Sequence, residues 1–126
     1  MSPATSAEAT AEAQALLSSD GQQVVTISDS PGFIAQRVVA MIVNIGCQIA
    51  QRGIATPADI DKAVKLGLGY PYGPLEWGDK LGAARVCWIL EYLTKFYNEP
   101  RYRPSPWLKR RAMLGLSLHA PDRKGA

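Results

Sequence analysis

The residues that could perform acid–base chemistry are few in this sequence. His119 is the only histidine, and Glu76 and Asp79 stand three positions apart. A carboxylate pair at this spacing could divide general acid and base roles on one helical turn. A structural interpretation is favoured, because Glu76 follows Pro74 in the first turn of a predicted helix, where its charge complements the helix dipole. His119 is predicted to be a solvated histidine of a C-terminal tail.

Glycines and prolines crowd the segment between residues 67 and 74, the second place where chemistry could occur. Successive backbone N–H groups in such a loop can cradle a phosphate group. The spacing differs from that of a phosphate-binding loop and the lysine of such loops is missing, so a rigid connection between helices is favoured. No G-x-G-x-x-G occurs in the chain. We therefore predict neither a cofactor site nor a metal site here.

Composition favours a single soluble domain. The chain has 126 residues, of which 47% are hydrophobic and 20% charged, as in ordinary globular proteins. The pI is near 9.0, but the basic residues are dispersed apart from residues 109–111, so we expect no nucleic-acid partner. Polar residues interrupt the most apolar stretch, residues 33–50, and no signal peptide is visible, so we expect no membrane partner and a cytoplasmic location. Cys47 and Cys87 are predicted to be buried free thiols.

Helical patterns cover most of the chain. The longest predicted helix runs from Pro31 to Arg52 behind an N-cap at Ser30, with apolar residues at helical spacing. Further helices are predicted from Thr56, from Pro74 and from Ser105, with another between Gly82 and Pro100. Residues 7–17 favour a helix, and the β-branched run within residues 22–27 favours a short strand. The predicted fold class is mostly α, a bundle of about five helices with an N-terminal helix–strand appendage.

The long predicted helix is apolar on more than one face. Its apolar residues are Ile34, Val38, Val39, Met41, Ile42, Val43, Ile45 and Ile49. The short helices that follow can hardly cover two faces of one long helix. An uncovered apolar face of this size normally marks an interface, and two-fold pairing is the commonest solution for identical chains. The pattern therefore predicts a homodimer.

Three segments resemble one known family. Residues 29–37 read D-S-P-G-F-I-A-Q-R and resemble its D-x-P-G-F-I-x-N-R motif. Residues 56–76 read T-P-A-D-I-D-K-A-V-K-L-G-L-G-Y-P-Y-G-P-L-E and resemble its A-T-P-E-D-I-D-x-A-x-x-x-G-x-G-x-P-x-G-P-x-E motif. Residues 101–106 read R-Y-R-P-S-P and resemble its Y-x-P-S-P element. Over about residues 23–115, the chain resembles the C-terminal domain of bacterial 3-hydroxyacyl-CoA dehydrogenases.

The resemblance implies a reaction and shows what is missing for it. Members of the family oxidise a 3-hydroxyacyl thioester with NAD, using a His–Glu pair of a nucleotide-binding domain as the base. An Asn at the start of the long helix orients the site, and Gln36 occupies that position here. Gln moves the amide one methylene outward, and hydrogen-bond catalysis depends on sub-ångström placement. Gln36 is the one catalytic position carried over, in degenerate form, and the isolated chain is expected to be inactive.

The resemblance also implies a fold and a division of the chain. The fold expected is a helical bundle like the C-terminal domain of 6-phosphogluconate dehydrogenase, over residues 29–116. Residues 1–28 would be a helix–strand remnant of a nucleotide-binding domain or a linker, and residues 117–126 a mobile tail. Some long members carry two such domains in tandem, and this chain resembles the second, non-catalytic copy.

Three functional hypotheses follow from the resemblance. In the first, the chain is a dimerisation and substrate-shaping module of a parent dehydrogenase that uses NAD, and its partners are a second copy and the nucleotide-binding domain. In the second, it is a non-catalytic module that binds CoA thioesters, with acyl-CoA as the ligand. In the third, it is an active enzyme supplied with a nucleotide-binding domain in trans.

Overall fold

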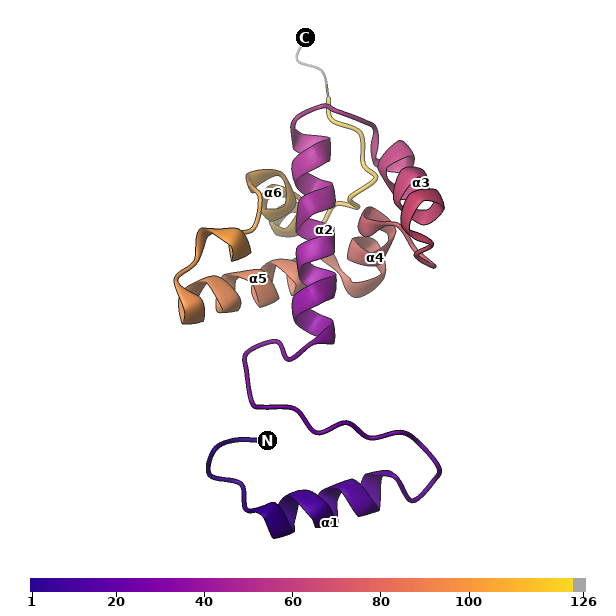
Figure 1. Ribbon diagram of the computed structural model, residues 1–126. Coiled ribbons are helices and arrows are strands. Elements are labelled where there is room, and N and C mark those ends of the chain that lie inside the picture. The colour runs from indigo at the N-terminus through magenta and orange to yellow at the C-terminus, as the bar shows by residue number, and fades with distance from the viewer. Residues whose placement is uncertain (124–126) are drawn as a thin grey trace.

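The computed structural model describes residues 1–123, and the described chain is built from helices (Figure 1). The fold is mostly α, as the sequence predicted. Its elements, in chain order, are α1 (Ala7–Leu17), α2 (Ala35–Gln51), α3 (Pro57–Leu68), α4 (Pro74–Leu81), α5 (Ala83–Tyr97), the short 3₁₀ helix η1 (Pro100–Tyr102) and α6 (Pro106–Leu114). None of these helices is long and apolar enough to cross a membrane.

Helix α2 is the centre of the bundle. It packs against α3, α4, α5 and α6, while α1 stands apart from the other helices (Figure 1). The core contains Ala40, Val43, Cys47, Ile60, Leu75, Val86, Leu90, Leu108 and Leu118. No residue of α1 is buried. The α2–α6 bundle is therefore the folded body of the described chain, and α1 contributes nothing to its core.

The helices α3, α4 and α6 begin where the sequence places capping residues and prolines. Thr56 Oγ1 accepts a hydrogen bond from the Asp59 N–H at 3.2 Å, and Ser105 Oγ accepts one from the Leu108 N–H at 3.1 Å. Prolines begin α3, α4 and α6, where a missing N–H leaves no hydrogen bond unmade. These predicted starts are confirmed.

Two N-terminal predictions are wrong. Helix α2 begins at Ala35 and not at Pro31, because Gly32 and Phe33 adopt φ angles of 73° and 44°, which break the helical path. Arg37 fixes this turn by donating hydrogen bonds to the Pro31 carbonyl and the Tyr97 hydroxyl. Residues 22–27 form no strand, since the described chain offers this segment no second strand with which to pair.

The segment that follows α6 also differs from the expectation of a free tail. Leu118 is completely buried in the core. It packs so closely on Gly78 of α4 that a Cβ at that glycine would overlap its side chain. We call residues 117–122 the C-terminal strap. Of the residues predicted to form a mobile tail, 124–126 lie outside the described part of the chain.

The two cysteines are buried free thiols, as predicted. Burial raises the pKa of the Cys47 thiol to about 12 and also raises the pKa of Cys87. Both sulfurs are therefore protonated and unreactive at neutral pH in the folded protein.

Candidate functional site

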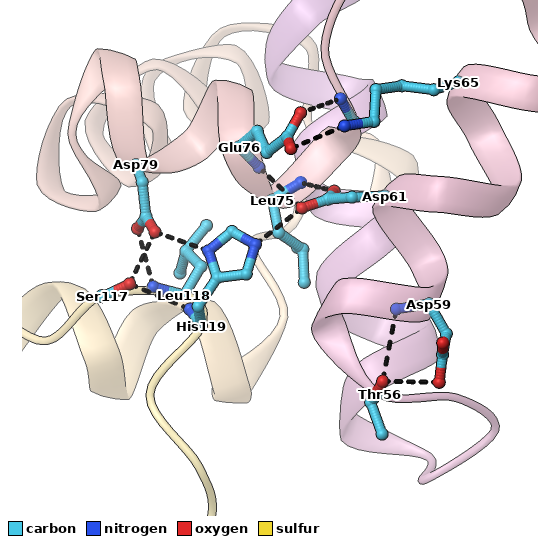
Figure 2. Close-up of polar contacts among 11 residues, drawn as sticks. Thr56, Asp59, Asp61, Lys65, Leu75, Glu76, Asp79, Ser117, Leu118 and His119 are labelled. Carbon is cyan, nitrogen blue, oxygen red and sulfur yellow. Dashed lines mark hydrogen bonds and ion pairs between the residues drawn. The ribbon is translucent and has the colours of Figure 1, made fainter.

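The strap brings His119 between two carboxylates from different helices (Figure 2). Nε2 of His119 lies 2.7 Å from Oδ2 of Asp61 in α3, and Nδ1 lies 2.8 Å from Oδ2 of Asp79 in α4. The Asp61 side chain is 3% exposed and the His119 side chain 35%. His119 is therefore partly exposed to solvent, as predicted, but it is held by two carboxylates and is not part of a free tail.

Asp61 is held in place by the N-terminus of the neighbouring helix. Its Oδ1 accepts a hydrogen bond from the Leu75 N–H at 2.8 Å, and its Oδ2 accepts one from the Glu76 N–H at 3.2 Å. These are first-turn N–H groups of α4, which have no partner inside their own helix. Gly73 makes the approach possible, because a Cβ there would collide with Asp61.

Asp79 ties the strap to α4. Its Oδ1 accepts a hydrogen bond from the Leu118 N–H at 2.7 Å, and its Oδ2 accepts one from the Ser117 hydroxyl at 2.6 Å. Burial acts to raise the pKa of Asp79, but the hydrogen bonds from Ser117, His119 and Leu118 outweigh it and lower that pKa. The carboxylate is therefore ionised when it faces the His119 ring.

The pKa of His119 shifts in the opposite direction to that of Asp79. Burial alone would lower its pKa, but the hydrogen bonds and charges of Asp79 and Asp61 outweigh burial and raise the pKa above its ordinary value. Both ring nitrogens are engaged, so neither is free to take a proton from a substrate. The arrangement connects three elements and does not resemble a general base poised for catalysis.

Glu76 does not pair with Asp79 as an acid–base couple. Its Oε2 accepts a hydrogen bond from the Gly73 N–H at 2.8 Å, and its Oε1 pairs with Lys65 Nζ at 2.8 Å. The hydrogen bond from Lys65, followed by that from Gly73, lowers the pKa of Glu76. Glu76 thus caps the start of α4 and ties it to α3, a structural role like the one the sequence favoured.

Gln36 lies away from this cluster, on the first turn of α2. It is exposed and lines an apolar hollow of about 270 Å³ between α2 and α5. The other lining residues are Ala35, Val39, Ala40, Leu81, Arg85, Val86 and Ile89. The hollow offers apolar side chains, one amide and one guanidinium, a set that can bind an acyl chain but holds no general base.

The buried position of Asp61 was not predicted, although one pattern in the sequence indicates it. Asp61 follows Ile60 and precedes Val64 by three positions, so it stands on the inward face of α3. A carboxylate at such a position needs a partner in the folded protein. Within residues 1–123, no cluster of three or more His, Cys, Asp or Glu side chains could hold a metal ion.

Comparisons with known proteins agree with the architecture. A profile of the family described as "3-hydroxyacyl-CoA dehydrogenase, C-terminal domain" matches residues 32–121, which include most of the strap. The chain is 46% identical over 106 residues to the 3-hydroxyadipyl-CoA dehydrogenase of Escherichia coli, covering 84% of this chain and 22% of that protein. It is 34% identical over 112 residues to a probable 3-hydroxybutyryl-CoA dehydrogenase of Bacillus subtilis, covering 89% of this chain and 39% of that protein.

A solved structure shows the same fold. The crystal structure of FadB2 from M. tuberculosis superposes with a TM-score of 0.86 at 32% identity, covering 91% of this chain and 41% of that one. The chain thus spans well under half the length of each of these three proteins, and it corresponds to one part of each.

Proposed function

Since the chain belongs to the family of 3-hydroxyacyl-CoA dehydrogenase C-terminal domains, we propose that it is the dimerisation and substrate-shaping module of such an enzyme. The parent enzyme would oxidise a 3-hydroxyacyl-CoA with NAD in the cytoplasm. A nucleotide-binding domain would supply the base and the cofactor site. This chain would supply helices that pair with a second copy and a wall that shapes the acyl site.

The observation that carries this proposal is the apolar stripe on α2. Ile34, Val38 and Ile45 are 61%, 49% and 52% exposed, although the helix is the centre of the bundle. They follow one another at helical spacing and so lie along one side of α2. The core closes on the other side of the helix without them. A stripe of this kind is favourable only when a partner covers it.

The oligomeric state tests the proposed module. We expect light scattering to return the mass of a dimer at high micromolar concentration, and Ile45→Glu to return a monomer with unchanged helical circular dichroism, because the variant places a carboxylate in the apolar seam. Leu66→Glu is the matched control, since Leu66 of α3 is exposed and lies outside the stripe. A monomeric wild-type chain, or a dimer that Ile45→Glu leaves intact, would refute this function.

Catalysis and cofactor binding are expected to reside in the parent enzyme. We expect no saturable NAD binding by the isolated chain and no oxidation of 3-hydroxybutyryl-CoA by the wild type or by Gln36→Asn. The variant restores the family residue, but His119, the single histidine, has both ring nitrogens bound to carboxylates. NADH production that depends on Asn at position 36 would contradict this assignment.

The hollow between α2 and α5 favours a second candidate, a module that binds CoA thioesters. Its apolar walls suit an acyl chain, and Arg85 at its lining offers a charge to a carboxylate at the far end of that chain. The E. coli relative is named for a 3-hydroxyadipyl substrate, whose acyl group ends in a carboxylate. An acyl group with a terminal carboxylate is therefore the ligand class that this candidate predicts.

Calorimetry with two acyl thioesters tests the second candidate. We expect adipyl-CoA to bind about tenfold more tightly than hexanoyl-CoA, because a charged hydrogen bond contributes ~1.5 kcal/mol. Arg85→Met should remove the preference, whereas Arg110→Met should keep it, because Arg110 is exposed on α6 and does not line the hollow. Absence of binding by both thioesters would exclude this candidate and leave the dimerisation module untouched.

A further inference from the structure

The two carboxylates around His119 impose a protonation state on the ring by geometry alone. A neutral imidazole has one N–H group and one acceptor nitrogen. It could donate to only one of Asp61 and Asp79, and it would direct a lone pair at the other carboxylate from 2.7 or 2.8 Å. Only the imidazolium satisfies both contacts (Figure 2). The clustered arrangement therefore requires the charged form of His119.

The ring is the link through which the strap reaches α3. The strap contacts α4 through the Ser117 hydroxyl and the Leu118 N–H, both bonded to Asp79. Its contact with the buried Asp61 of α3 is made by His119 Nε2. Loss of the proton from the ring would leave at least one of these carboxylates facing a lone pair. We propose that His119 is a proton-operated latch, which as an imidazolium holds residues 117–119 against α3 and α4 and loosens them when the proton is lost.

The other charged groups near the ring do not replace this latch. From α4, Glu76 senses the charge of His119, but its carboxylate points away from the ring and is paired with Lys65 of α3 (Figure 2). Asp59 and Asp122 line the same groove as His119, between α3 and the strap. The Asp122 carboxylate forms an ion pair with Arg111 of α6 at 2.6 Å. The guanidinium stays charged at all physiological pH values. The end of the strap therefore remains anchored to α6 while the His119 latch responds to pH.

The sign of the pH effect follows from the raised pKa of His119. Stability contributed by the latch is fully present below the ordinary value of 6.5 and is lost as the pH rises through the folded-state pKa. Asp79, whose pKa is lowered, remains ionised throughout this range. Alkaline conditions should thus loosen the strap, while mildly acidic conditions should tighten it.

Nuclear magnetic resonance can follow this ring without assignment, because the chain has a single histidine. We expect the His119 ring signals of the full 126-residue chain to titrate with a midpoint above 6.5. Asp79→Asn should lower the midpoint, as should Asp61→Asn if that variant folds. Asp122→Asn is the matched control, which removes a strap carboxylate outside the latch and should leave the midpoint unchanged. A wild-type midpoint at or below 6.5, or one that Asp79→Asn does not lower, would overturn the latch.

Proteolysis tests the loosening itself. We expect chymotrypsin to cleave the protein after Leu118 several-fold faster at pH 9 than at pH 6. Each cleavage rate is divided by the rate for a free peptide with the sequence of the strap at the same pH, which removes the pH dependence of the protease itself. His119→Gln, which cannot form the imidazolium, should be cleaved rapidly at both pH values. Asp122→Asn should retain the pH dependence. Equal normalised rates for the wild type at pH 6 and pH 9 would overturn the proposal, whatever the ring titration gives.

Discussion

At the scale of single residues, Gly78 is required by close packing. A Cβ added there would overlap the Leu118 side chain and approach Val43 Cγ1 to 2.9 Å. Its helical backbone needs no glycine for conformational reasons. Gly67 in α3 is the opposite case, because no atom other than those of its chain neighbours and its own helical backbone lies within 4 Å of the place where its Cβ would stand.

Alanine substitutions at these two glycines should change the free energy of unfolding in opposite directions. Gly78→Ala should lower the free energy of unfolding by ~1–3 kcal/mol, because the methyl group forces Leu118 and Val43 apart. Gly67→Ala should raise it by up to ~1 kcal/mol, since alanine restricts the unfolded chain and suits a helix. Urea unfolding followed by circular dichroism measures both. Two changes of the same sign would show that the strap does not press on α4 as described.

Residue roles were predictable only where they depend on neighbours in sequence. Glu76 lies in the first turn of α4, so its capping role could be inferred from Pro74 two positions earlier. The roles of Asp61 and His119 depend on a contact across 58 positions of the chain. Gln36 could be located at the start of α2 by motif, but its place beside an apolar hollow required the packing of α2 on α5.

At the scale of elements, Asn44 joins α2 to the segment between η1 and α6. Its Nδ2 donates to the Arg103 carbonyl at 2.9 Å, and its Oδ1 accepts from the Ser105 N–H at 2.8 Å. The side chain is buried. One amide thus satisfies two backbone groups of the segment between η1 and α6.

Removal of this amide should destabilise the bundle. Asn44→Ala leaves the Arg103 carbonyl and the Ser105 N–H without their partner, and we expect a loss of ~1–3 kcal/mol in the free energy of unfolding. Gln48→Ala, one turn further along α2 on an exposed position, is the control and should change it by less than ~0.5 kcal/mol. Thermal and chemical denaturation provide the comparison. An equal effect of the two substitutions would contradict the bridging role of Asn44.

Element types were predictable from local chemistry, and the two failures have local causes. Caps and first-turn prolines at Thr56, Pro74 and Ser105 determined the helix starts because both effects act within one turn. The start of α2 was misplaced because Gly32 and Phe33 adopt positive φ angles that the apolar pattern does not reveal. The predicted strand at residues 22–27 failed because a strand needs a partner, which a one-dimensional pattern cannot supply.

At the scale of the whole molecule, the two ends of the described chain contribute unequally to thermal stability. Residues 1–28 include α1, none of whose residues is buried, so their deletion should change the melting temperature little. Deletion of residues 117–126 removes Leu118 from the core, and emptying a leucine site costs ~2–5 kcal/mol. We expect calorimetry to show a much lower melting temperature for the second deletion alone. Equal losses from both deletions would contradict this division.

The buried cysteine in the middle of α2 provides a chemical probe of how often the core opens. Cys47 is fully shielded and its thiol pKa is about 12, so an alkylating reagent can reach a reactive thiolate only in molecules that have opened around α2. The alkylation rate at Cys47 would then report how often the core opens, whereas Cys87 on α5 would report smaller openings of its own helix. Mass spectrometry of the two peptides would separate whole-domain unfolding from local breathing in a single experiment.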